Sequence, residues 1–425
     1  MLAYWRFYWP LALMGLAMVL SVQFQNAALA RYPEAITELA IFALAYSTFG
    51  FFRASLNFIA QLSNVFARSQ PGTERCHRFV VAASILIMLP LILLGHSTAG
   101  AKLLAVVFRI DADLTGRVQE YLIYLAPIIL LGAQRFYYTG LLVQARLTGW
   151  VTSLNVFFLV MVIVGLIAGF QLGLRPVHVL VGSEAVAILI QLIATIYVKR
   201  RYYRLPATAE HESLTYGELT RFFIPVSLTG VMFALSRPVL YAFVSRTPDG
   251  ILAIAAMRVA FDFAMLFQQA ANQFRHFFVT FGLDDLATKR RFMMLIWAGL
   301  TAIMLLIALT PVSNLIWRDL MRIPDDVRAL STDVFLIMCL MPTVIILRNY
   351  FHGRLMVERR TSGMAVGSIL RVAGIYAGAQ VLFSLDLLNS LSASALLLFG
   401  FLIEAAVVYQ AAKGQGERVK ATANI

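Results

Sequence analysis

Apolar stretches of about 20 residues recur along the chain between Trp9 and Gln410, and short polar or Pro- and Gly-containing connections separate them. A helix needs roughly 20 mostly apolar residues to cross the hydrocarbon core of a membrane. The pattern therefore predicts an all-α polytopic membrane protein with about twelve transmembrane helices. We expect the first stretch to stay in the protein as an integral helix, because no small-residue cleavage site follows it.

An internal duplication relates the two parts of the chain. The first copy begins at Arg6 and reads RFYWPLALMGLAMVLSVQFQNAALAR; the second begins at Arg221 and reads RFFIPVSLTGVMFALSRPVLYAFVSR. They align without a gap, and the same register continues as far as Asn57 and Asn272. The alignment covers two successive helices, so chance matching of apolar residues does not explain it.

Two further pairs of segments extend the duplication. The chain reads RFYYTGLLVQARLT from Arg135 and RNYFHGRLMVERRT from Arg348, and it reads RIDADL from Arg109 and RIPDDV from Arg322. An even number of helices in each repeat gives both halves the same orientation, with a central cleft between them. Two parallel six-helix repeats around a central cleft are a transporter architecture, and this arrangement resembles that of MATE/MOP-like exporters.

The alignment also predicts where the halves begin and end. The longest polar stretch is expected to be a cytoplasmic linker between two helices. The predicted parts are an N-terminal six-helix half (1–198), the linker (199–216), a C-terminal six-helix half (217–412) and a cytoplasmic tail (413–425). The outer connections 97–118 and 312–330 are longer than the others, and we expect each to contain a short interfacial helix.

The composition agrees with a lipid environment, since 60% of the residues are apolar, 13% are charged and the mean hydropathy is +0.79. The net charge of +13 does not indicate a nucleic-acid partner, because Lys and Arg lie between apolar segments and form no soluble basic domain. They recur after every second helix, which by the positive-inside rule predicts cytoplasmic termini. Composition and compactness favour a bacterial inner membrane.

Several kinds of chemistry have no support in the sequence. The two cysteines, Cys76 and Cys339, cannot build a disulfide framework, and no Cys/His spacing resembles a zinc site. No Walker or G-x-G-x-x-G motif occurs, and no His/Asp/Glu or Ser/His set is clustered for acid–base or nucleophilic catalysis. We therefore expect no cofactor, no bound metal and no enzymatic activity.

Polar residues inside the apolar segments are the most informative local feature, because charges in a bilayer normally face a cavity or a partner. The eighth predicted helix has a polar stripe about 100° wide. Its members are Arg258, Asp262, Gln269, Asn272, Gln273 and His276. The second helix has a comparable stripe of Tyr46, Arg53, Asn57, Gln61 and Asn64. The seventh offers Ser227, Arg237, Tyr241 and Ser245, and the first offers Gln23 and Asn26.

Arginine in these stripes suits an anion, because a guanidinium is permanently charged and donates two parallel hydrogen bonds to phosphate or carboxylate. The predicted substrate site contains Arg53, Arg237 and Arg258, together with the polar residues Asn57, Tyr241, Asn272, Ser236 and Gln269. Two alternatives compete with this interpretation. Arg258 and Asp262 are spaced i, i+4 and can neutralise each other, and Arg53 can extend toward the cytoplasmic face.

Two glutamates occupy corresponding positions near the ends of the halves, Glu184 in SEAVAILIQL and Glu404 in IEAAVVYQAA. A buried carboxylate can carry a proton, so both glutamates, with Asp262, are candidates for coupling. Structural pairing with the arginines of neighbouring helices is the competing and favoured interpretation. Those arginines are Arg135, Arg348 and Arg371.

Several short strings resemble the progressive ankylosis protein family of the multidrug/oligosaccharidyl-lipid/polysaccharide (MOP) exporter superfamily. They are YWPL at 8–11, LAYS at 44–47, SRP and FVSR within 236–246, LRV at 370–372, and the string around Arg348 with Gly353, Leu355, Met356 and Thr361. The resemblance implies export of pyrophosphate, or of ATP and citrate. It also implies that Ser236, Arg237 and Arg246 are the leading candidates for site residues.

We therefore expect an alternating-access exporter of a small polyanion such as pyrophosphate, ATP or citrate. A flippase for a pyrophosphate-linked lipid is one alternative, because its substrate would also require arginines. A cation-coupled multidrug exporter is another, although it would be expected to use a carboxylate-rich cleft. The expected partners are a small anionic solute and membrane lipids, and a duplicated chain can work as a monomer.

Overall fold

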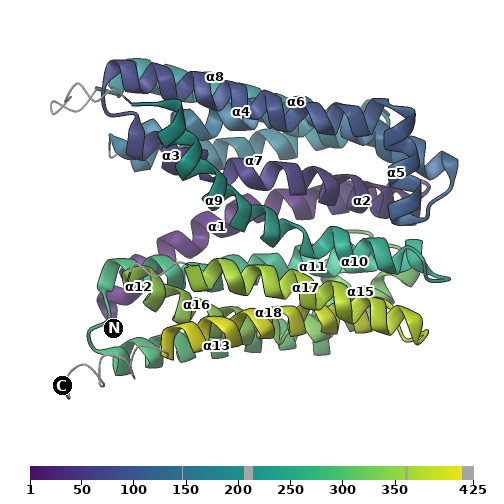
Figure 1. Cartoon of the computed structure of the whole chain (residues 1–425). Helices are drawn as coiled ribbons and strands as arrows, with labels where there is room; N and C mark the ends of the chain where they lie inside the picture. Colours follow the sequence, from purple (N-terminus) through teal and green to yellow (C-terminus); the bar gives the residue numbers. More distant parts are fainter. Residues whose placement is uncertain (146, 205–213, 359–361, 414–425) are drawn as a thin grey trace. The chain divides into compact units, whose positions relative to one another are not determined.

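The computed structural model describes residues 1–145, 147–204, 214–358 and 362–413. Throughout these ranges the regular secondary structure is helical, which confirms the all-α prediction (Figure 1). Contacts divide the chain into two compact units. We call Ile41–Pro238 the N-terminal unit, and Met1–Ala40 with Val239–Ile425 the C-terminal unit.

The helices of the N-terminal unit are consecutive in the chain. They are most of α2 (Ala35–Ala54), η1 (Ser55–Phe58), α3 (Ile59–Phe66), α4 (Gln70–His96), α5 (Thr98–Phe108), α6 (Ala112–Gln144), α7 (Thr148–Gln171), α8 (Pro176–Tyr202) and α9 (Tyr216–Ala234). Helix α6 packs against α3, α4 and α8, so it is the central helix of this unit. Helix α9 belongs to this unit because it contacts η1 and α3.

The C-terminal unit begins with the first helix of the chain, which packs along α11. Its helices are α1 (Leu2–Leu29), α10 (Ser236–Val244), α11 (Gly250–Asn272), α12 (Phe274–Phe281), α13 (Leu286–Leu309), α14 (Val312–Asn314), the π-helix η2 (Leu315–Leu320), α15 (Asp325–Met338), α16 (Met341–Val357), α17 (Ser362–Ser384) and α18 (Ser390–Lys413). The first helix of each predicted repeat thus packs mainly with helices of the other repeat. The division of the sequence into duplicated halves 1–198 and 217–412 stays a prediction.

Among the described residues, ten stretches are long and apolar enough to cross a membrane. Two of them join consecutive helices, at 35–66 and 325–355. The first and seventh predicted segments correspond to α1, which has 28 residues, and to α9 followed by α10. The structure therefore confirms a multi-pass membrane protein, and these two segments account for the difference between ten and the predicted twelve.

The two long outer connections contain short helices, as predicted. Helix α5 lies in 97–118, and α14 with η2 lies in 312–330. Both are followed by an arginine with positive φ, at 48° for Arg109 and 56° for Arg322. These two residues are partners in the sequence duplication, so the repeat extends to a backbone conformation that non-glycine residues rarely adopt. Residues 205–213 of the predicted linker and 414–425 of the predicted tail lie outside the described residues.

The duplication is also visible as an interruption of one helix in each unit. The chain changes helix at Phe58, between η1 and α3, and at Gln273, between α11 and α12. These positions are 215 residues apart, which is the offset between Arg6 and Arg221. No proline stands at either interruption. We therefore attribute the breaks to packing contacts that recur in both units.

Hydroxyl groups from a neighbouring helix bind a backbone carbonyl at each interruption. The hydroxyl of Tyr8 on α1 donates to the carbonyl oxygen of Ala270 at 2.7 Å, and Ser227 on α9 donates to that of Ser55 at 3.1 Å. Ser55 and Ala270 are again 215 residues apart. A broken helix is tolerated inside a membrane when side chains bind the freed backbone groups, which explains these donors.

Close packing of α3 on α6 depends on Gly140. A Cβ atom there would lie 2.3 Å from the carbonyl oxygen of Ala60 and would overlap Ser63 Oγ. We predict that Gly140→Ala lowers the free energy of unfolding by about 1–3 kcal/mol, because one of the two helices must move. Thermal denaturation of the purified protein measures this. Gly132→Ala on the same helix is the control, because a Cβ there meets nothing within 4 Å; equal losses in both variants would contradict the prediction.

Candidate functional site

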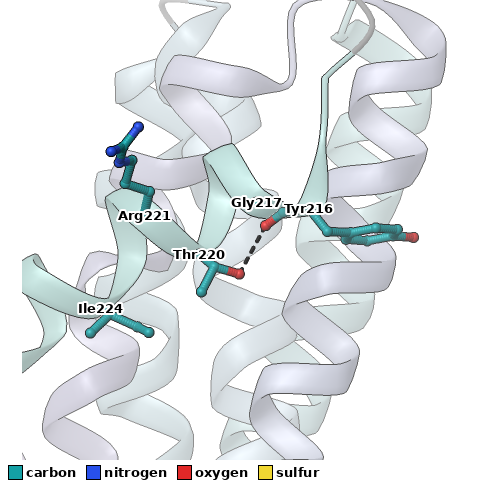
Figure 2. Close-up of a pocket in the computed structure, with 5 residues that line it drawn as sticks. All are labelled: Tyr216, Gly217, Thr220, Arg221 and Ile224. Carbon is teal, nitrogen blue, oxygen red and sulfur yellow. Dashed lines mark hydrogen bonds between the residues drawn. The ribbon is translucent and has the colours of Figure 1, made fainter.

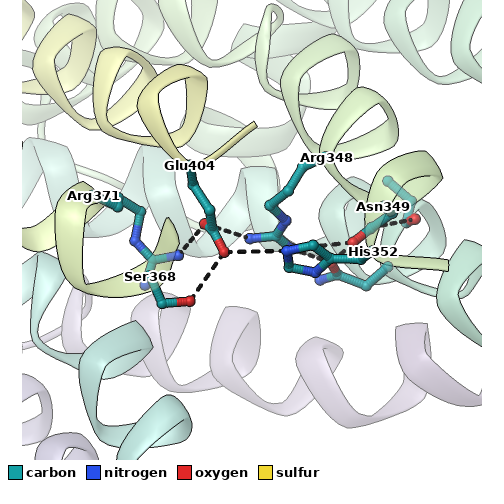
Figure 3. A network of polar contacts seen from close by, with 8 residues as sticks. Arg348, Asn349, His352, Ser368, Arg371 and Glu404 are labelled. Carbon is teal, nitrogen blue, oxygen red and sulfur yellow. Dashed lines mark hydrogen bonds and ion pairs between the residues drawn. The ribbon is translucent and has the colours of Figure 1, made fainter. Parts of the chain in front are cut away.

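A buried cluster of charged side chains lies where α16, α17 and α18 run side by side in the C-terminal unit (Figures 1 and 3). We call it the C-terminal glutamate cluster; its members are Glu404, Arg348, His352, Ser368 and Arg371. Small residues bring the helices together. A Cβ on Gly367 would lie 3.3 Å from Glu404 Cγ, and one on Gly400 would lie 3.2 Å from Arg371 Cγ.

Glu404 is the acceptor at the centre of this cluster. Its Oε2 accepts from Arg371 Nη1 at 2.5 Å and from Arg348 Nη1 at 3.3 Å. Its Oε1 accepts from Ser368 Oγ at 3.1 Å and lies 3.6 Å from His352 Nε2. Both arginines also lie over the ring of Phe401, which contributes a cation–π attraction.

Arg348 connects this cluster to the broken end of α11. Its Nη2 donates to Asn272 Oδ1 at 3.1 Å and approaches Asn349 Oδ1 at 3.4 Å. Asn349 Nδ2 donates to the carbonyl oxygen of Ala271 at 2.9 Å and to Asn272 Oδ1 at 3.2 Å. Arg348 and Asn349 are fully buried, whereas Asn272 is partly exposed. Asn272 is therefore the most exposed of these three side chains.

A corresponding cluster occupies the N-terminal unit and is built from α2, α6 and α8. We call it the N-terminal glutamate cluster. Arg53 Nη1 lies 3.4 Å from Glu184 Oε1, and Tyr46 donates to the same carboxylate at 3.3 Å. Arg135 Nη1 donates to Gln191 Oε1 at 3.0 Å, and its guanidinium lies over the ring of Phe136.

The two clusters are related by the duplication but differ in how the arginines are paired. Glu404 forms ion pairs with Arg348 and Arg371, as the structural interpretation of the sequence expected. Glu184 pairs with Arg53, which was not among the suggested partners, whereas the suggested partner Arg135 donates to a neutral amide. In both units two arginines accompany one glutamate.

A third polar group joins α1 to α11. Arg258 Nη2 lies 3.6 Å from Asp262 Oδ2, and both side chains are almost fully buried. Asn26 connects them, since its Oδ1 accepts from Arg258 Nε at 2.9 Å and its Nδ2 donates to Asp262 Oδ2 at 3.3 Å. The i, i+4 pairing that the sequence offered as the alternative for Arg258 is therefore present.

The remaining predicted site residues are distributed over both units. Arg237 and Ser236 lie at the start of α10, where Ser236 is buried and Arg237 is partly buried. Tyr241 is buried on α10, and Gln269 is partly buried near the end of α11. The side chains of Asn57 and His276 lie outside the part of the structure that is described.

Sequence reasoning missed three neutral members of these clusters, although each has a recognisable spacing. Ser368 precedes Arg371 by one helical turn, and Gln191 follows Glu184 by two turns. Asn349 directly follows Arg348. A search for polar residues on the same helical face as each buried charge would have found the first two.

A shallow surface pocket of about 510 Å³ lies beside the first turns of α9, apart from the clusters (Figure 2). Its lining consists of Tyr216, Gly217, Thr220, Arg221 and Ile224. The Thr220 hydroxyl already donates to the carbonyl oxygen of Tyr216 at 2.8 Å, so this pocket adds little to the candidate site. Among the described residues, no group of three or more His, Cys, Asp or Glu side chains is arranged as a metal site.

Known transporter structures share this fold. The lipid II flippase MurJ in an inward closed conformation aligns with a TM-score of 0.68 at 14% identity, covering 94% of this chain and 87% of that one. An inward-facing multidrug resistance MATE transporter of the MOP superfamily aligns with 0.65 at 15% identity, covering 97% and 95%. A MOP superfamily transporter from Pyrococcus furiosus gives 0.57 at 14%, covering 96% and 95%. The chain is thus a multi-pass membrane protein with the MOP transporter fold.

The family model of the progressive ankylosis protein (ANKH) matches residues 1–205. This match confirms the resemblance that the short strings at Tyr8 and Leu44 indicate. The remaining strings quoted for that resemblance lie beyond residue 205.

The Arg258–Asp262 pair yields a test of its structural role. We predict that Asp262→Leu costs about 3–5 kcal/mol of unfolding free energy, because it leaves Arg258 buried without its carboxylate. The double variant Arg258→Met/Asp262→Leu should recover most of that loss, since the uncompensated charge is gone. Thermal denaturation of the two single variants and the double variant measures the coupling. Additive losses would contradict a structural pair.

Proposed function

We propose that this protein is an alternating-access transporter that exports a small polyanion, such as pyrophosphate, ATP or citrate. The observation that carries the proposal is the charge of the two glutamate clusters. In each unit two arginines accompany one glutamate. An excess guanidinium inside apolar helices is costly on its own and is stabilised by an incoming anion.

The chemistry of the clusters matches phosphate and carboxylate better than a cationic substrate. Guanidinium groups donate two parallel hydrogen bonds to such anions, and a low-dielectric environment strengthens these bonds. A transporter of cationic drugs would instead require an excess of carboxylates. The resemblance to the progressive ankylosis family over residues 1–205 supports the same choice.

The predicted substrate residues Arg53, Arg237 and Arg258 remain part of this proposal. Arg53 is the most accessible arginine of the glutamate clusters, with 28% of its side chain exposed, and it touches Glu184. Arg258 is neutralised by Asp262, so it is a weaker candidate than Arg53. We further propose a bacterial cytoplasmic membrane with both termini inside, from the distribution of Lys and Arg, and a functional monomer.

A lipid flippase is the second candidate. The similarity to the lipid II flippase MurJ, with a TM-score of 0.68, favours it. The arginine-rich clusters also suit a lipid-linked pyrophosphate, because that group offers the same oxygens. The transporter from Pyrococcus furiosus is described as having a binding pocket of reverse polarity and a different function, so this fold accommodates pockets of different charge.

Efflux from proteoliposomes distinguishes the two candidates. We predict export of radiolabelled pyrophosphate, citrate or ATP by the purified protein, and at least about a tenfold loss of rate in Arg53→Gln, because a charged hydrogen bond to the anion is worth about 1.5–3 kcal/mol. Arg53→Lys should retain part of the activity, since it keeps the charge but not the paired donors. Arg221→Gln on the exposed start of α9 is the control and should be unchanged.

One outcome of this experiment would reject the polyanion proposal. If none of the three anions moves and a fluorescent pyrophosphate-linked lipid is translocated between the leaflets, the chain is a flippase and the polyanion proposal fails.

A further inference from the structure

Two side-chain N–H donors on α16 are directed at a residue at the end of α11. Arg348 Nη2 and Asn349 Nδ2 converge on one oxygen atom, Asn272 Oδ1, at 3.1 and 3.2 Å. Two N–H donors that converge on one oxygen, one of them charged, form the arrangement that binds an oxygen of phosphate or carboxylate. In this structure a side-chain carbonyl occupies that position.

The arrangement lies at the broken end of α11, where free carbonyl groups would repel an anion. Each of three consecutive carbonyls is bound by a side-chain donor. Gln273 donates to Gln269 O at 3.2 Å, Tyr8 to Ala270 O at 2.7 Å and Asn349 to Ala271 O at 2.9 Å. These donors offset the negative end of the interrupted helix. The carbonyl groups at the break therefore repel an anion less than free carbonyl groups would.

Charge and exposure support a binding role over a purely structural one. Arg348 shares Glu404 with Arg371, whose contact of 2.5 Å is shorter than its own at 3.3 Å. The Arg348 guanidinium is thus the more distant of the two from Glu404. It is fully buried, but its amide partner Asn272 is partly exposed and ends α11. Asn272 is therefore the member of this network that is closest to the surface of its unit.

The other half of the chain lacks this arrangement. The duplication aligns Arg348 with Arg135, and it aligns Asn349 with Phe136. Phe136 lies against the Arg135 guanidinium, 4.9 Å from ring centre to Cζ, and offers no amide donor. The paired donors are therefore specific to the C-terminal unit and are not a requirement of the repeated fold.

We propose that Arg348 and Asn349 form an anion subsite in the C-terminal unit, which takes an oxygen of a phosphate or carboxylate group in place of Asn272 Oδ1. The subsite deepens the proposed function and rests on it. Asn272 acts as an internal substitute for the anion, and the substrate displaces it.

Binding of pyrophosphate to the purified protein, measured by isothermal titration calorimetry, tests the subsite. Asn272→Ala removes the competing oxygen and should tighten binding by about two- to tenfold, the value of one hydrogen bond. Asn349→Phe copies the other repeat and should weaken binding at least about tenfold. Arg348→Lys should weaken binding similarly, whereas Arg354→Lys, a control on the same helix but outside the cluster, should leave it nearly unchanged.

Thermal denaturation confirms that each variant is folded. Weaker binding in a folded Asn272→Ala variant would overturn the proposal, because it would make Asn272 a direct ligand. Equal weakening by Arg354→Lys and Arg348→Lys would also overturn it. Pyrophosphate transport with unaltered binding in all four variants would reject the subsite and leave the proposed function intact, whereas absence of both binding and transport of every anion in the wild type rejects both.

Discussion

Each unit of this protein depends on how buried arginines are compensated within apolar helices. A guanidinium cannot lose its charge in a protein, so every buried arginine requires an acceptor or a ring. Glu404 supplies the acceptor in the C-terminal unit, where it holds α16 and α17 on α18. Glu184 and Gln191 share this role in the N-terminal unit. These contacts hold the neighbouring helices together in each unit.

A second constraint is the backbone itself, which has no water to bind in a membrane. The interruptions at Phe58 and Gln273 free carbonyl groups, and hydroxyls from α9 and α1 bind them. The donors come from the first helix of the opposite repeat, which explains why these helices pack with the other repeat. Each break thus binds the first helix of the opposite repeat, so that α1 and α9 each belong to the unit formed mainly by the other repeat.

The sequence alone predicted much of this fold. Apolar stretches located the helices, and the length of the outer connections predicted short helices there. The duplication predicted the relation between Glu184 and Glu404. It did not predict the breaks, because no Pro or Gly marks Phe58 or Gln273 and the interruption depends on tertiary donors. It also did not include Arg53 among the suggested partners of Glu184. The choice of Arg53 depends on how α2 and α8 pack, which periodicity does not determine.

The site was predicted less completely. The polar stripe of α11 is present, but it separates into two groups about 15 Å apart along the helix. Asp262 with Arg258 forms one group, and Asn272 with Arg348 forms the other. A stripe shows which residues share a face, and it does not show which of them neutralise one another. The anion subsite that we propose lies at Arg348, which sequence reasoning had listed only as a partner for a glutamate.

The most direct test of an anion-binding interior is the thermal stability of the purified wild-type protein with added ligands at constant ionic strength. The account predicts that pyrophosphate, citrate or ATP raises the melting temperature, because ligands that bind the native state stabilise it. Ethidium, a cationic drug, should have no such effect. Stabilisation by ethidium and not by any of the three anions would contradict the account.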